Sequence, residues 1–297
     1  MHFTGIVPAV MVPFDPDDAI DVDALRANVA HMVDRGVHGL VANGTMGEAG
    51  SLSDEERALV ARTVAGLAHA SGLPALVGVS SGSTATSARL AAAAREAGAD
   101  GVMCQPPLSY DGTDEEMVAF FDAVAAAAGL PLMIYNNPAA TGVDLTAERI
   151  AAIAAAVPAI AAVKECSGDA RRIAELVAGT DLDVLVGGDD WALEGLAAGA
   201  DGWVAGVGNP FPAECVALAE LVAAGRLDEA RALYARLLPL ARLDMTPHLV
   251  QHFKGALDAV GLTGGPARPP RLPLDAAGRA TLDAALAALG VGSSAAA

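Results

Sequence analysis

The sequence alternates between short apolar runs and longer alanine-rich segments along most of its length. Apolar runs of about four to eight residues that end at Gly, Pro or Asn are typical of buried strands. The alanine-rich segments often begin with Ser, Thr or Asp, as helix N-termini do. This repeated order of strand and helix predicts an α/β protein with a parallel sheet. The predicted strands cover residues 6–12, 38–42, 74–78, 101–104, 132–135, 160–164, 184–186 and 202–205.

Eight predicted strands in a chain of 297 residues indicate a single TIM (β/α)8 barrel. A weak internal repeat supports this count, because residues 96–102 resemble residues 197–203, and each copy ends a helix at Gly and begins a strand. Ser53 and Thr113 are each followed three residues later by Glu, which predicts a capping box at two helix starts.

Beyond Pro212 the pattern becomes wholly helical, which is more helix than one strand–helix unit requires. We therefore predict a barrel over residues 1–224, a C-terminal helical extension over residues 225–291 and a frayed tail over residues 292–297. The predicted helices in this part of the chain cover residues 213–224, 227–243, 247–260 and 275–288.

The composition narrows the class of partner. A formal net charge of −18 argues against nucleic acid and anionic membranes, because phosphate binding needs clustered Lys and Arg. The three cysteines, Cys104, Cys166 and Cys215, have no CxxC spacing, so neither a disulfide framework nor a zinc site is expected. The sequence has no basic leader, and its longest apolar stretch, residues 151–163, is broken by Pro158 and too short to span a bilayer. We expect a cytoplasmic protein.

The strongest chemical signal is Lys164, one of only two lysines in the sequence, at the end of the sixth predicted strand. Burial disfavours the charged form of an amine, so we expect a lowered pKa for Lys164. A neutral amine can attack a carbonyl carbon and form a Schiff base. The alternative is that Lys164 forms a structural ion pair with Glu165 or another nearby carboxylate.

Thr45, Tyr135 and Lys164 all lie at the ends of predicted strands, and in a barrel these ends share one face. A tyrosine hydroxyl close to the amine could transfer protons while the Schiff base forms, and the Thr45 hydroxyl could relay or orient that proton. The backbone N–H groups of the turn from Gly44 to Gly47 could hold the carboxylate of a 2-oxo acid. The three side chains are therefore the predicted catalytic residues.

Four motifs on successive strand ends give the chain a family resemblance. Residues 44–48 (GTMGE), 135–142 (YNNPAATG), 163–169 (VKECSGD) and 188–190 (GDD) resemble the dihydrodipicolinate synthase/N-acetylneuraminate lyase family in order and spacing. The resemblance implies a TIM barrel with a C-terminal helical domain, a Schiff-base lysine at Lys164, a proton-transferring Tyr135 and a hydroxyl relay at Thr45. It implies no metal or organic cofactor, and it implies a homotetramer.

Three positions depart from the family pattern. Met46 replaces a second Ser or Thr after Thr45, Ala140 replaces the arginine usual in dihydrodipicolinate synthases, and Ser109, with Tyr110 beside it, occupies the position of a relay tyrosine. These losses remove a hydrogen-bond donor and a carboxylate clamp. They argue against a dihydrodipicolinate synthase and against a close sialic acid lyase. The predicted substrate-binding residues are Gly44, Met46, Gly47, Ser109, Tyr110, Ala140, Gly188 and Val204.

The sequence thus predicts a Schiff-base lyase that acts on pyruvate or a larger 2-oxo acid by aldol-type cleavage or formation of a carbon–carbon bond. One alternative is a deaminase or dehydratase that uses the same lysine imine, because Met46 and the missing arginine also resemble the family's deaminases of a hydroxylated pyrroline carboxylate. A true dihydrodipicolinate synthase and a non-catalytic barrel that binds a small ligand are further alternatives.

Weaker candidates have structural explanations. Asp189 and Asp190 are expected to cap a helix that begins at Trp191, because adjacent carboxylates point different ways. His248 and His252 are four residues apart on a predicted helix, but they lack the glutamate of an HExxH metal motif. The glycine-rich turns after the seventh and eighth strands could cradle a phosphate, although no basic residue follows them closely.

Overall fold

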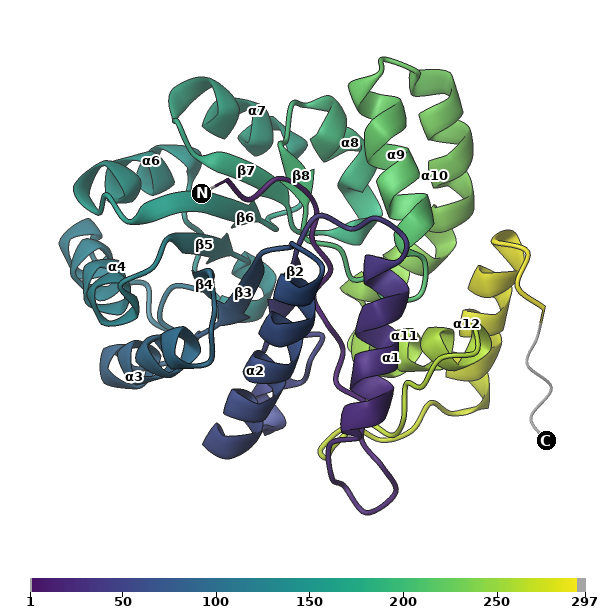
Figure 1. Ribbon diagram of the computed structural model, residues 1–297. Helices are drawn as coiled ribbons and strands as arrows, with labels where there is room; N and C mark the ends of the chain where they lie inside the picture. The colour runs from purple at the N-terminus through teal and green to yellow at the C-terminus, as the bar shows by residue number, and fades with distance from the viewer. Residues whose placement is uncertain (1, 293–297) are drawn as a thin grey trace.

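The computed structural model describes residues 2–292, and its eight parallel strands curl into a barrel surrounded by helices (Figure 1). The strands pair in the order β1-β8-β7-β6-β5-β4-β3-β2, so from β2 to β8 each strand lies beside the next one in the chain, and β1 lies beside β8. This confirms the predicted fold class. The strands are β1 (Gly5–Ile6), β2 (Leu40–Ala42), β3 (Ala75–Gly78), β4 (Gly101–Cys104), β5 (Leu132–Asn136), β6 (Ile160–Glu165), β7 (Asp183–Val186) and β8 (Gly202–Trp203).

Backbone hydrogen bonds after β1 close the ring between the first and second strands. The N–H of Val41 donates to the carbonyl of Pro8, and the N–H of Val10 donates to the carbonyl of Val41, each at 2.9 Å. The predicted first strand, residues 6–12, is regular only at its start, because the chain beyond Ile6 bonds alternately to β8 and β2. This closure leaves no exposed sheet edge.

Helices follow the strands as predicted, and the capping boxes at Ser53 and Thr113 are both present. The barrel helices are α1 (Val22–Val33), α2 (Asp54–Ala70), α3 (Thr84–Glu96), α4 (Asp114–Ala128), α6 (Ala147–Ala156), α7 (Ala170–Gly179), α8 (Ala192–Ala197) and α9 (Pro212–Ala223), with a short α5 (Pro138–Thr141) after β5. The last three are α10 (Leu227–Ala241), α11 (Leu249–Ala259) and α12 (Ala276–Ala288).

Helices α10, α11 and α12, green to yellow in Figure 1, gather on one side of the barrel. The division into a barrel of residues 1–224 and an extension of residues 225–291 stays a proposal. Residues 293–297, most of the predicted tail, lie outside the described residues. None of the helices within residues 2–292 combines the length and apolar character that a membrane crossing requires.

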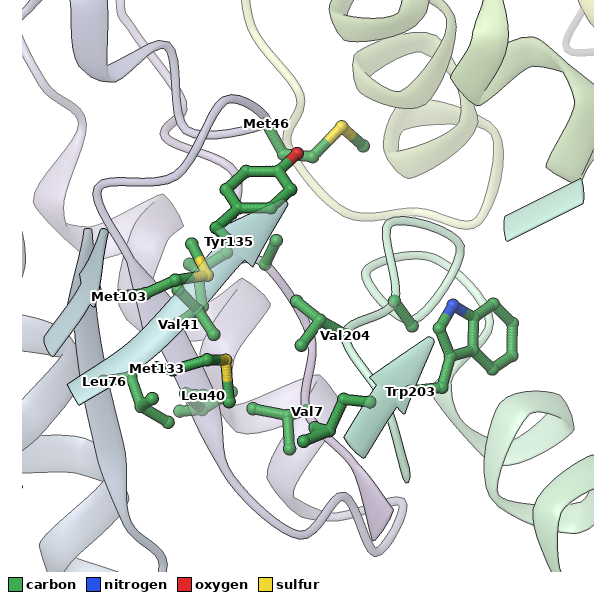
Figure 2. Packing of buried hydrophobic residues seen from close by; sticks show 14 of the residues in the cluster. Val7, Leu40, Val41, Met46, Leu76, Met103, Met133, Tyr135, Trp203 and Val204 are labelled. Carbon is green, nitrogen blue, oxygen red and sulfur yellow. The ribbon is translucent and has the colours of Figure 1, made fainter. Parts of the chain in front are cut away.

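The barrel interior is filled by apolar side chains from all around the sheet. Figure 2 shows Val7, Leu40 and Met133 packed together inside it, with Tyr135 and Met46 at one end of the cluster. All five side chains are buried. The barrel interior is therefore a packed core rather than a pore.

The predicted role of Asp189 as a helix cap is wrong. The Asp189 carboxylate is fully buried and accepts hydrogen bonds from the Trp203 indole N–H at 3.0 Å and from the backbone N–H groups of Gly206 and Val207 at 3.0 and 2.7 Å. No side chain caps the 3-10 helix η2 (Asp189–Trp191) or helix α8 after it. Asp189 instead ties the end of β7 to the loop after β8. Trp203 is fully buried, as core packing predicts.

Candidate active site

Lys164 and Tyr135 are paired residues on the neighbouring parallel strands β6 and β5. Paired residues of adjacent strands point to the same face of the sheet, about 4.8 Å apart. The Lys164 amine accordingly lies over the Tyr135 ring, with Nζ 3.9 Å from the ring centroid. Both side chains are buried, with 6% and 5% of their surface exposed. The strands thus fix an amine against a phenol at the end of the barrel interior.

Glu165 does not pair with Lys164, so that alternative is wrong. Successive side chains of a strand point to opposite faces. The Glu165 carboxylate therefore lies outside the barrel interior, where it accepts hydrogen bonds from the Asn136 side chain at 2.8 Å and the Ser167 N–H at 2.6 Å. Within residues 2–292, no carboxylate oxygen lies within 4.0 Å of the Lys164 amine.

The three predicted catalytic residues line one cavity of about 300 Å³ at the carboxyl ends of the strands. Lys164 and Tyr135 are contributed by β6 and β5, and Thr45 follows β2. Four of the predicted substrate-binding residues line the same cavity: Gly44, Met46, Ala140 and Val204.

Two predicted glycines lie outside this cavity. A Cβ atom on Gly188 would come within 2.2 Å of the Trp191 indole nitrogen, so Gly188 packs against that ring. A Cβ on Gly47 would lie 2.8 Å from the carbonyl oxygen of Val10. Gly187, next to Gly188, does line the cavity, and a Cβ there would lie only 3.0 Å from Cε of Lys164. Gly187 therefore leaves room for the lysine side chain.

Ser109 and Tyr110 also lie outside the cavity, on the exposed loop between β4 and α4. The Ser109 N–H donates to the carbonyl of Thr141, and the Tyr110 hydroxyl donates to Glu116 at 2.9 Å. Tyr110 is 52% exposed. The hydrogen bond to Glu116, in the acidic first turn of α4, holds Tyr110 at the surface of the loop. A role of either residue in substrate binding stays a prediction.

The predicted lowering of the Lys164 pKa is wrong. Burial acts in that direction, but the charges that Tyr135, Cys166 and Asp244 carry when deprotonated oppose it, and the pKa of Lys164 is raised. Burial also raises the pKa of Tyr135, and it raises that of Cys166 to about 12, so both groups keep their protons near neutral pH. The amine of the free protein is therefore protonated, and Asp244 is the one of the three that can be ionised beside it.

The Tyr135 hydroxyl accepts a hydrogen bond from the side-chain amide of Asn137 at 2.9 Å. In the described part of the chain no hydrogen bond joins Tyr135 to Thr45, whose side chain is exposed at the mouth of the cavity. The backbone N–H groups of Thr45 and Met46 likewise have no acceptor within residues 2–292. That these N–H groups bind the carboxylate of a 2-oxo acid stays a prediction.

Sequence analysis missed the residues that the C-terminal helices contribute to the cavity. Asp244 and Met245, in the 3-10 helix η3 (Arg242–Met245), and Thr246 and Pro247 after it form one wall. Burial raises the pKa of Asp244 to about 6. The sequence offered one signal for this wall, which is Asp244 followed by Thr246 and Pro247 between α10 and α11. No local pattern indicates where a segment between two helices packs.

His248, just before α11, and His252, within α11, lie close to one another. The rings of His248 and His252 lie edge to face, 6.3 Å apart, and His252 contacts the Thr246 hydroxyl at 3.3 Å. Residues 2–292 contain no group of three His, Cys, Asp or Glu side chains that could hold a metal ion.

Loss of the Thr45 hydroxyl should lower activity moderately. We expect Thr45→Val to slow turnover by less than about 10²-fold, because Thr45 does not contact Tyr135 directly and water can replace its hydroxyl in a proton relay. The comparison to make is kcat for wild type, Thr45→Ser and Thr45→Val, with Thr45→Ser close to wild type. Equal kcat for Thr45→Val and wild type would exclude the relay role.

Known proteins resemble this chain over nearly its whole length. The sequence model of the "Dihydrodipicolinate synthetase family" matches residues 2–289. A 4-hydroxy-tetrahydrodipicolinate synthase from Sorangium cellulosum is 38% identical over 288 residues, covering 95% of this chain and 93% of the relative. One from Kineococcus radiotolerans is 37% identical over 291 residues, with coverages of 97% and 94%. The solved structure of the synthase from Methylacidiphilum fumariolicum SolV has a TM-score of 0.91 at 31% identity, covering 97% of this chain and 96% of its own.

The fold, the cavity and these relatives define an enzyme of the class I lyases and aldolases, which act through a Schiff-base lysine. The chain belongs to the dihydrodipicolinate synthetase family. This membership sets aside the non-catalytic barrel as an alternative.

Proposed function

We propose that this enzyme forms a Schiff base between Lys164 and a 2-oxo acid, pyruvate or a larger one, and makes or breaks a carbon–carbon bond of that acid. The observation that carries the proposal is the buried Lys164 amine, 3.9 Å from the Tyr135 ring centroid, in a cavity that also exposes unpaired backbone N–H groups. These N–H groups bind the carboxylate of the 2-oxo acid, which brings its keto carbon to the amine.

The residues then divide the chemistry. The Lys164 nitrogen adds to the keto carbon, and the two protons that the ammonium loses as the imine forms pass to the keto oxygen, which leaves as water. The Tyr135 hydroxyl, which keeps its proton at neutral pH, carries them by donating its proton to that oxygen and regaining one from the nitrogen. The resulting iminium accepts the electron pair of the breaking C3–C4 bond, so that a substrate with a hydroxyl on C4 loses that hydroxyl's proton and yields an aldehyde and an enamine. A proton added to C3 of the enamine replaces the one lost from the hydroxyl, and hydrolysis of the iminium then releases pyruvate.

The lining of the cavity supports a substrate without a second anionic group. Lys164 is the only Lys or Arg among the described residues that line it, and Ala140 occupies the position of the synthase arginine. We therefore expect poor condensation of pyruvate with aspartate semialdehyde, although the relatives described above are named as synthases of that type. True synthase activity remains a further alternative.

A deaminase or dehydratase that uses the same imine is the second candidate. The observation that favours it is Met46, which is buried at the cavity wall and brings a thioether in place of a hydroxyl. In that reaction the iminium assists loss of an amino or hydroxyl group from the substrate chain, and no carbon–carbon bond breaks.

A turnover screen distinguishes these reactions. Release of pyruvate and release of ammonia are both followed for a panel of 2-oxo acids and cyclic imino acids, together with synthase activity. We expect pyruvate without ammonia. Ammonia without pyruvate would select the deaminase, and efficient synthase activity would contradict the weight given to Ala140 and Met46. Reduction with borohydride should trap the Lys164 adduct for mass spectrometry, and its absence with every acid would reject the proposal.

Assembly and location stay proposals as well. The family resemblance supports a homotetramer, and the acidic composition, with net charge −18, supports a small-molecule substrate rather than nucleic acid as the partner. Location in the cytoplasm stays an expectation from the sequence. Sedimentation of the purified protein measures its oligomeric state directly.

A further inference from the structure

Asp244 is a carboxylate in the catalytic cavity to which the reaction described above gives no task. It lies in η3, outside the barrel strands, and lines the same cavity as Lys164. Its only hydrogen bond within residues 2–292 is a long one, in which the Asp189 N–H donates to Oδ2 at 3.5 Å. No Lys, Arg or His nitrogen of the described residues lies within 4.0 Å of it. The second carboxylate oxygen therefore remains available to a ligand.

The charges around Asp244 leave it as the negative group of the cavity. Lys164 faces it from β6, and Tyr135 and Cys166, the other groups that interact with its charge, keep their protons near neutral pH. From η2, Asp189 and Asp190 face it as well. Burial and the Asp244 charge raise the pKa of Asp189, and burial raises that of Asp190. The cavity thus has an amine from the barrel and a carboxylate from the C-terminal part, without direct contact between them.

Such a carboxylate discriminates between substrate tails. It accepts a hydrogen bond from a hydroxyl or ammonium group of the tail. An apolar tail would remove water from the carboxylate without replacing its hydrogen bonds, which weakens binding. A tail carboxylate would be repelled by its negative charge. The cavity of about 300 Å³ exceeds what a three-carbon acid fills, so it has room for the tail of a longer acid beside this wall.

We propose that Asp244 determines substrate specificity by accepting a hydrogen bond from a tail hydroxyl of the lysine-bound 2-oxo acid, and that it excludes acids with a tail carboxylate. The proposal rests on the Schiff-base function argued above and adds the class of substrate: a hydroxylated 2-oxo monocarboxylic acid. A 2-oxo acid with a tail amine could also donate a hydrogen bond to Asp244, so the experiment must distinguish it from the hydroxylated acid.

The test uses four 2-oxo acids and measures the concentration that gives half-maximal borohydride trapping. Pyruvate has no tail, and the other three have equal chain length and end in a hydroxyl, a carboxylate or an amine. In wild type the hydroxyl acid should be preferred over the dicarboxylic acid. In Asp244→Asn this preference should fall by about 10- to 100-fold, because hydrogen bonds to charged groups contribute that much. Trapping of pyruvate should change far less than trapping of the hydroxyl acid, because for pyruvate only the effect of Asp244 on the pKa of Lys164 is lost. Asp190→Asn, which removes a neighbouring carboxylate that does not line the cavity, should behave as wild type.

Each possible failure has a separate meaning. If wild type traps no pyruvate, the Schiff-base function fails. If pyruvate is trapped but the preference is the same in wild type and Asp244→Asn, the specificity role is overturned. Equal loss for pyruvate and the hydroxyl acid overturns it too, because Asp244 would then act on the lysine. A larger preference for an acid with a tail amine than for the hydroxyl acid would overturn the assigned class.

A pH profile adds a readout that a purely structural residue would not change. The Asp244 carboxylate, with a pKa of about 6, is ionised above that pH and protonated below it. The preference of wild type for the hydroxyl acid should therefore decline as the pH falls through about 6, and the profile of Asp244→Asn should be flat there. A wild-type preference that is constant across this range contradicts the proposal.

Discussion

Replacement of Lys164 by alanine is expected to abolish both turnover and the borohydride-trapped adduct. The amine is the nucleophile of the proposed reaction, and no other side chain that lines the cavity can form an imine with a keto carbon. The variant should still fold, because Lys164 forms no ion pair within residues 2–292 and its removal takes a cation out of a buried site. Activity assays with each acid, and intact-protein mass spectrometry after reduction, measure the two losses.

Lys164→Arg is the matched variant, because it keeps the positive charge and removes the nucleophile. It should be as inactive as the alanine variant. The chain contains one other lysine, Lys254, whose Nζ lies 2.8 Å from Oε1 of Glu48 and 2.6 Å from the carbonyl of Pro266. An adduct that maps to Lys254, or one that persists in Lys164→Ala, would contradict the assignment.

The parts of the fold that were predicted correctly depend on local sequence. Each strand is an apolar run that ends at a small or polar residue, and the capping boxes at Ser53 and Thr113 determine where α2 and α4 begin. The meeting of Lys164 with Tyr135 follows from the same information, because side chains at the ends of barrel strands share one face. The predicted catalytic residues could therefore be brought together without knowledge of any distance.

The features that were not predicted depend on contacts between distant segments. Asp189 lies in the core because Trp203 and the backbone after β8 donate hydrogen bonds to it. Asp244 reaches the cavity because η3 packs beside η2. The Asp189 N–H of η2, which donates to Asp244, lies 55 positions earlier in the chain. The raised pKa of Lys164 depends on the same approach of Asp244. The pattern of residues along the chain predicts the order of the helices, but it does not predict where the segment between α10 and α11 packs.

Loss of the Tyr135 hydroxyl should have the second largest effect on catalysis. Tyr135→Phe keeps the ring beneath the Lys164 amine and the packing of the barrel end, but removes the group that donates a proton to the leaving oxygen. Transfer of a proton by a positioned side chain is typically worth at least about 10²-fold, so kcat should fall by that factor or more.

The variant should retain its fold and its affinity for the 2-oxo acid, since the N–H groups of Thr45 and Met46 are unchanged. A decrease in kcat with little change in KM is therefore the expected pattern. Asn137→Ala provides the comparison, because it removes the amide that donates to the Tyr135 hydroxyl at 2.9 Å, together with the Oδ1 that accepts from the Ala140 N–H at the start of α5. Its kcat should fall less than that of Tyr135→Phe, because the proton donor itself remains. A near-normal kcat for Tyr135→Phe would exclude Tyr135 from proton transfer and leave a water molecule or the Thr45 hydroxyl as the donor.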